Sequence, residues 1–200
     1  MRRGSHGMSR AFRQLVTGLT LLVGSTIPAA GTVVLPTDLV ELSHQAEVIV
    51  LGRVVAVEAR RISASRIDSL VTFEPAQYLK GDYGDSVVFQ VPGGREGRYR
   101  SVVVGAPVLR PGDRVVLFLR GRPPALPHLL GLSQGVFRLV VDPSSGGLLV
   151  SPPALVNPGP DAVAVVRGDP TRRLVSVAEF AQQVARALAR PRPASLGSPR

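Results

Sequence analysis

Short runs of β-branched and aromatic residues, separated by turn residues, dominate the chain from residue 47 to residue 150. The runs expected to form strands span 47–60, 67–79, 86–91, 98–104 and 114–119, and a hairpin joins 135–141 to 147–150. The segments between them are rich in Gly, Pro and Asp, as is typical of turns. Because no helical periodicity interrupts the series, the pattern predicts an antiparallel sandwich or barrel. Gly52 suggests a bend in the first run, which favours a small barrel.

Two amphipathic helices are expected, one on each side of this β region. The first spans 36–45 and follows a proline–threonine start signal. The second spans 176–190 and opens with the capping box Ser176-Val177-Ala178-Glu179. We expect its apolar stripe to pack on the barrel, and binding of a partner protein is the alternative. The stripe comprises Val177, Phe180, Val184 and Leu188.

The first thirty residues have the three parts of an export signal: four arginines, an apolar run over 15–27, and small residues near 29–31. This pattern predicts a secreted or periplasmic protein whose translation starts at Met1 or Met8. The alternative is a protein anchored by an uncleaved N-terminal helix, which is the one route to membrane contact that the sequence suggests. The remainder divides into a barrel domain (31–150), a Pro/Gly-rich excursion with the C-terminal helix (151–190) and a disordered tail (191–200).

Charge adds a candidate binding surface to this picture. The chain has 24 basic and 14 acidic residues, and its only lysine is Lys80. Arginines cluster in two predicted loops, so an unknown protein or an acidic envelope polymer is the expected partner. Nucleic acid is disfavoured, because only three tyrosines, Tyr78, Tyr83 and Tyr99, could stack on bases. The clustered arginines are Arg60, Arg61 and Arg66 in one loop, and Arg95, Arg98 and Arg100 in the other.

Candidate chemistry is sparse, so we expect a protein without enzyme activity, metal or cofactor. The chain has no cysteine, which excludes disulfides, thiolate ligands and cysteine nucleophiles. Gly131-Leu132-Ser133-Gln134-Gly135 matches the nucleophile elbow, but a strand is expected after it and the last histidine, His128, precedes it. Asp82 and Asp85 are expected to form a turn rather than a calcium site.

Several segments, in order, give a family resemblance. AEVIVLGRVVAVEAR, VTFEPAQYLKG, VVFQVPGG, GAPVLRPGDRVVLFL and GLSQGVFRLVVD together resemble an uncharacterised family of exported bacterial proteins. The core of that family is similar to the OB-like barrel of netrin-type and TIMP-like domains. The resemblance implies a five-stranded OB-like barrel in which Lys80 and Gly81 close the second strand. It implies structural turn roles for Lys80, Gly81, Gly93, Gly94, Gly105, Pro107 and Gly112.

These observations favour a non-enzymatic binding or structural protein of the cell envelope or the extracellular space. One alternative is an accessory or inhibitor-like partner of an exported metalloprotease, engaged through the segment 92–100. The zinc-chelating N-terminal cysteine of TIMP-like inhibitors has no counterpart here. A second alternative is an OB-type module that binds polyanions or nucleic acid through the arginine loops.

Overall fold

The computed structural model of the protein describes residues 38–122, 124–153 and 173–192. The predicted signal peptide therefore lies outside the described residues, as do most of the excursion and of the C-terminal tail. Within the described residues, no helix is both long and apolar enough to cross a membrane.

The described chain is mainly β, as predicted, and is built around one eight-stranded sheet. The strand order is β1-β2-β3-β7-β6-β8-β9-β10, and β1 pairs with β6 as well. All pairs are antiparallel except β3–β7, which is parallel. The strands are β1 (Val48–Arg61), β2 (Ile67–Lys80), β3 (Val87–Pro92), β6 (Arg114–Arg120), β7 (His128–Leu129), β8 (Val136–Val141), β9 (Leu148–Ser151) and β10 (Val175–Ser176).

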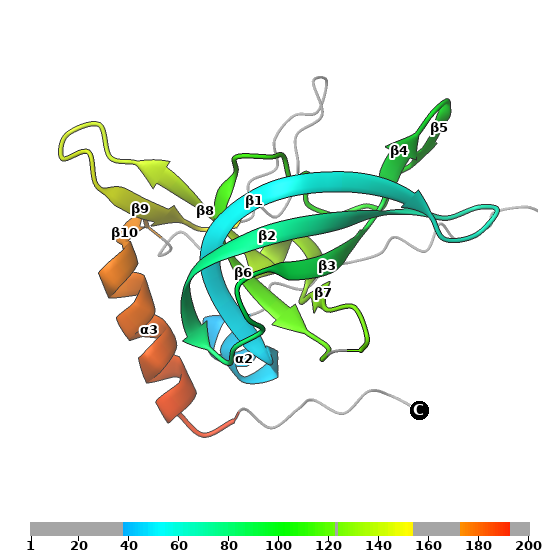
Figure 1. Cartoon of the computed structure of the whole chain (residues 1–200). Helices are drawn as coiled ribbons and strands as arrows, with labels where there is room; N and C mark the ends of the chain where they lie inside the picture. Colours follow the sequence, from blue (N-terminus) through cyan, green and yellow to red (C-terminus); the bar gives the residue numbers. More distant parts are fainter. Residues whose placement is uncertain (1–37, 123, 154–172, 193–200) are drawn as a thin grey trace, which may run out of the picture. The chain divides into compact units, whose positions relative to one another are not determined.

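Strand β1 bends strongly because glycine lets it approach its neighbour closely. Its first half pairs with β6 while residues 49–61 pair with β2, and both long strands curve together in Figure 1. The β1–β2 register shifts beside Gly52, which lies opposite Pro75. A Cβ on Gly52 would lie 2.1 Å from the carbonyl oxygen of Glu74, so no other residue fits here. The predicted bend at Gly52 is confirmed.

Strand β6 separates two apolar cores, because its side chains alternate between two buried faces. Val115, Leu117 and Leu119 pack with β1, β2 and β3 in the first core. Val116 and Phe118 point the other way and join the second core, which includes residues of helices α2 (Leu39–Gln45) and α3 (Val177–Ala189). Between its two exposed end residues, strand β6 is therefore buried on both faces.

Helix α3 begins at the predicted capping box and buries one stripe. The Ser176 hydroxyl accepts a hydrogen bond from the Glu179 amide at 3.2 Å. Phe180 and Val184 are buried in the second core, and the Phe180 ring lies 4.9 Å, centroid to centroid, from that of Phe137. The aliphatic and aromatic residues of the stripe are thus largely covered by the sheet.

The segment 92–104 differs from its prediction as a loop followed by one strand. It forms a separate hairpin of β4 (Gly94–Glu96) and β5 (Tyr99–Ser101), drawn at the upper right of Figure 1. Gly93 and Gly97 have φ values of 96° and 58°, so glycine permits both reversals of the chain. Residues 102–104 lie outside any strand and are exposed. Local backbone reversals therefore override the β-branched pattern there.

Candidate functional site

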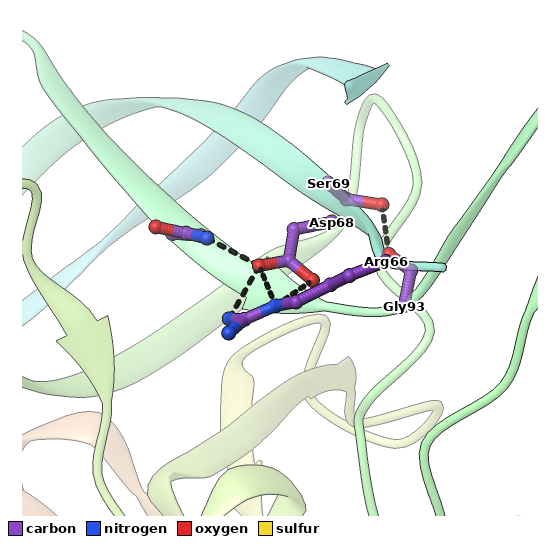
Figure 2. Close-up of polar contacts among 5 residues, drawn as sticks. Arg66, Asp68, Ser69 and Gly93 are labelled. Carbon is purple, nitrogen blue, oxygen red and sulfur yellow. Dashed lines mark hydrogen bonds and ion pairs between the residues drawn. The ribbon is translucent and has the colours of Figure 1, made fainter. Parts of the chain in front are cut away.

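The β4–β5 hairpin is fixed to the end of the β1–β2 ladder by close contacts of two glycines. The Ser69 hydroxyl donates a 2.8 Å hydrogen bond to the Gly93 carbonyl oxygen (Figure 2). A Cβ on Gly94 would lie 2.9 Å from the Ser69 hydroxyl oxygen and 3.4 Å from the Ala59 Cβ. The backbone at Gly93 and Gly94 thus lies directly against β1 and β2, which explains the Gly-Gly pair in the sequence.

A buried carboxylate holds the ends of β2 and β3 together beneath this hairpin. Asp68 is only 1% exposed, and it accepts hydrogen bonds from Arg66 Nε at 2.9 Å and Nη2 at 2.6 Å (Figure 2). The Gln90 amide nitrogen donates a further hydrogen bond from β3. The Arg66 guanidinium and Gln90 together outweigh burial and hold the pKa of Asp68 below its usual range. Asp68 is therefore ionised at neutral pH and acts as a structural anchor between β2 and β3.

A cavity of about 260 Å³ lies between the hairpin and the sheet, and we call it the hairpin pocket. Its sheet side is formed by the aliphatic residues Val57, Val71 and Val91 of β1, β2 and β3. Its other side is formed by the hairpin and the following segment. The remaining lining residues are Ser69, Pro92, Gly93, Gly94, Arg95, Arg100, Ser101, Val102, Val103, Ala106, Pro107, Val108 and Leu109.

Two arginines that line the hairpin pocket have no acidic partner among the residues that the structure describes. Arg95 and Arg100 face each other directly across the β4–β5 ladder, and both are exposed. Arg95 donates only a long 3.4 Å hydrogen bond to the Gly97 carbonyl oxygen. No ion pair within the described residues involves either side chain. Like charges placed directly opposite each other destabilise a ladder, so a bound anion would relieve this repulsion.

The other arginines of the predicted binding surface have different roles. Arg61 forms an ion pair with Glu96 at 3.0 Å, and its guanidinium lies 4.5 Å from the centre of the Tyr99 ring. Arg98 lies 5.0 Å from the same centre and donates to the Tyr99 hydroxyl. These contacts support the hairpin. Of the remaining two, Arg66 binds Asp68, and the exposed Arg60 contacts no partner within the described residues.

Lys80 lies at the opposite end of the β1–β2 ladder and binds a helix terminus. Its ammonium donates to the carbonyl oxygens of Ser43 at 2.8 Å, His44 at 3.4 Å and Ala46 at 2.5 Å. A cation is favoured at the C-terminal end of α2 by the helix dipole. Burial lowers the pKa of Lys80, Arg192 lowers it further, and Glu47 opposes both. Arg192, in the predicted tail, also donates to the His44 carbonyl.

The other residues of the turn signature have local roles. A Cβ on Gly81, whose φ is 63°, would lie 2.5 Å from the Glu47 carbonyl oxygen. Gly105 accepts from the Ser133 amide at its carbonyl oxygen, and Gly112 donates from its amide to the Val54 carbonyl. Pro107 lines the hairpin pocket. The structure thus brings Gly93, Gly94, Arg95, Arg100 and Pro107 together at the hairpin pocket, and Arg61 and Arg98 contact the hairpin without lining the pocket.

Sequence reasoning missed the aliphatic residues that complete the pocket. Val102, Val103 and Val108 are all exposed and line it, although Val102 and Val103 were predicted to lie in the strand 98–104. The signal that could have identified them is their position between glycines and prolines, where a strand cannot continue.

The motifs with possible chemistry do not form a catalytic or metal centre in the described residues. Ser133 lies in a short 3-10 helix, η1 (Leu132–Gly135), which leads into strand β8. The Asp82 carboxylate accepts from the Gly84 amide at 2.7 Å, as a turn residue does. No three His, Asp or Glu side chains gather there as metal ligands. No protein-family model matches the chain, and no curated protein matches it.

Proposed function

We propose that the protein is an exported, non-enzymatic binding protein whose hairpin pocket binds an anionic group of a ligand or partner. The proposal rests on the position of Arg95 and Arg100. The two arginines lie opposite each other on the β4–β5 ladder, and both line a largely aliphatic cavity. A guanidinium group presents a planar set of donors that matches a carboxylate or phosphate. Two such groups without acidic partners are better explained by binding than by stability.

We propose further that the strands around the first core form a small OB-like barrel. The pairings β1–β2, β2–β3, β3–β7, β7–β6 and β6–β1 follow one another in a ring, which supports this interpretation. The hairpin pocket would then lie at the mouth of the barrel, a common place for ligand sites. Strands β8, β9 and β10 extend the sheet beyond the ring.

Export is supported by the signal-like pattern of residues 1–30. A protein secreted or held in the periplasm would meet acidic polymers and proteins of the envelope. The modest excess of arginine over acidic residues favours such encounters.

The nucleic-acid alternative has weaker support, because the tyrosines are engaged within the protein. The Tyr78 hydroxyl donates to the Gly84 carbonyl, and the Tyr83 hydroxyl donates to that of Gly121. Two guanidinium groups lie over the Tyr99 ring. Base stacking would need free aromatic faces. An accessory role beside an exported metalloprotease stays open as one form of the proposed binding function, with the partner's acidic groups on the hairpin.

The test compares retention on a heparin matrix for the purified chain and two charge-matched double variants. Arg95→Gln/Arg100→Gln removes the pair at the pocket. Arg110→Gln/Arg120→Gln removes two exposed arginines that do not line it. We expect the first variant to elute at clearly lower salt than the second. Equal elution of the two variants would refute the proposal, because retention would then depend on net charge alone.

A further inference from the structure

The geometry points to an amphipathic anion, a short aliphatic chain with one acidic headgroup, as the ligand class of the hairpin pocket. This inference rests on the proposed function and narrows it. The headgroup is held between Arg95 and Arg100, and the chain enters the cavity behind them.

The interior of the pocket selects an apolar group. Three valines of the sheet, Val57, Val71 and Val91, lie opposite Leu109 and the valines of the segment after β5. One of the two lining hydroxyls, that of Ser69, already donates to the Gly93 carbonyl, which leaves the Ser101 hydroxyl as the remaining polar side chain besides the two arginines. Transfer of a hydrocarbon chain from water to such an aliphatic lining lowers the free energy of the complex.

The size of the pocket limits the chain that it can hold. Its volume of about 260 Å³ lies just below the range of about 300–1,000 Å³ that is usual for sites of drug-sized ligands. A short alkyl chain fits this volume, whereas a steroid or a long acyl chain would extend out of it. Val102 and Val108, exposed at 69% and 56%, give an apolar surface at the opening on which a longer chain could continue.

Charge complementarity selects the headgroup. Among the residues that the structure describes, Arg95 and Arg100 are the only charged residues that line the pocket, and none of the lining residues is acidic. Glu96, the nearest acidic neighbour in sequence, is paired with Arg61. A single carboxylate or phosphate can accept hydrogen bonds from both guanidinium groups and cancel their mutual repulsion. A cationic or uncharged headgroup gains nothing at this position.

Titration calorimetry of the purified chain with octanoate tests this ligand class, and octyl phosphate, octanol and octylamine serve as comparison probes. We expect octanoate or octyl phosphate to bind at one site, with the tighter of the two identifying the headgroup. Octanol and octylamine should bind at least about tenfold more weakly. Arg95→Gln/Arg100→Gln should lose at least about tenfold in affinity for the anion, while Arg110→Gln/Arg120→Gln keeps it.

A second variant tests the cavity independently of the charges. Val103→Phe places a larger side chain at the pocket lining, at an exposed position where it should not disturb folding. We expect it to abolish octanoate binding while the heparin elution stays unchanged.

The outcomes separate the ligand class from the proposed function. Equal affinity for octanol and octanoate, or an unchanged affinity in the Arg95→Gln/Arg100→Gln variant, would overturn the inference. If neither anion binds but heparin retention still depends on the arginine pair, the proposed function stands and the amphipathic ligand is wrong. If neither the affinity for octanoate nor the heparin elution changes in the Arg95→Gln/Arg100→Gln variant, both the proposed function and the amphipathic ligand class are wrong.

Discussion

Lys80 donates a 2.5 Å hydrogen bond to the carbonyl oxygen of Ala46, so the single lysine of the chain ties the last residue of β2 to the end of helix α2. The same ammonium also binds the Ser43 carbonyl at 2.8 Å. A lysine isolated in the sequence is therefore a structural clamp between two segments that lie more than thirty residues apart. Its compact ammonium can reach several carbonyls that converge on one point.

Replacement of Lys80 tests this clamp. We expect Lys80→Met to lower the free energy of unfolding by about 2–3 kcal/mol, because charged hydrogen bonds to part-buried carbonyls are lost. Lys80→Arg should lower the free energy of unfolding less, by about 1 kcal/mol, because the charge remains while the planar guanidinium fits the carbonyls less well. Chemical denaturation measures both values, and Arg120→Met is the exposed control. A Lys80→Met variant as stable as the control would show that the contact contributes nothing.

Asp68 should make stability depend on pH in the acid range. Arg66 holds the folded-state pKa of Asp68 below the unfolded value near 3.8. The resulting stability is therefore fully present at pH values well above the unfolded-state pKa and is lost as pH falls through the lower, folded-state pKa. We expect Asp68→Asn to be less stable than the native chain at pH 7 by about 1–3 kcal/mol, because Arg66 loses its charged partner. The difference in stability between Asp68→Asn and the native chain should shrink below pH 3.

Unfolding curves recorded from pH 2 to pH 7 check the Asp68 prediction. Asp85→Asn is the matched control, because this exposed carboxylate contacts no partner within the described residues. An Asp68→Asn variant whose deficit stays constant across that range would contradict the role given to the carboxylate.

Tyr99 should determine how firmly the β4–β5 hairpin is held. Each strand of the hairpin has three residues, too few for stability on their own. We expect Tyr99→Leu to lower the free energy of opening the hairpin by about 1 kcal/mol, since exposed cation–π contacts are each worth about 0.5–1 kcal/mol. Amide hydrogen exchange should accelerate in the hairpin and not in β6. Tyr99→Phe keeps the aromatic ring that Arg61 contacts, so it should retain most of the protection against exchange. If Tyr99→Leu leaves that protection unchanged, other contacts hold the hairpin.

Much of the fold could be predicted because long strands carry their own pattern. Strands β1, β2 and β6 and the β8–β9 hairpin follow runs of β-branched residues bounded by turn residues. The β4–β5 hairpin could not be predicted in this way, because its short strands depend on two glycines with positive φ and on contact with Ser69. Strand β7, of two residues, exists only because β3 and β6 lie on either side of it.

The site was only partly predictable for the same reason. The arginine clusters are visible in the sequence, but the partner that each arginine contacts is not. Arg61 pairs with Glu96 across 35 positions of the chain, whereas Arg95 and Arg100 lie opposite each other on the β4–β5 ladder and pair with no carboxylate of the described residues. Which arginines remain available for a ligand is therefore a property of the folded chain.

The central claim, that Arg95 and Arg100 bind an anion at the hairpin pocket, is tested most directly by NMR of the arginine side chains. Nε–H resonances are followed while octanoate is added to the purified chain at low salt, with sulfate as a second, compact anion. We predict that those of Arg95 and Arg100 shift and saturate together with the amides of Gly94 and Val103, while those of Arg110 and Arg120 do not move. Small, unsaturating shifts of similar size at all four arginines, with either anion, would contradict the account.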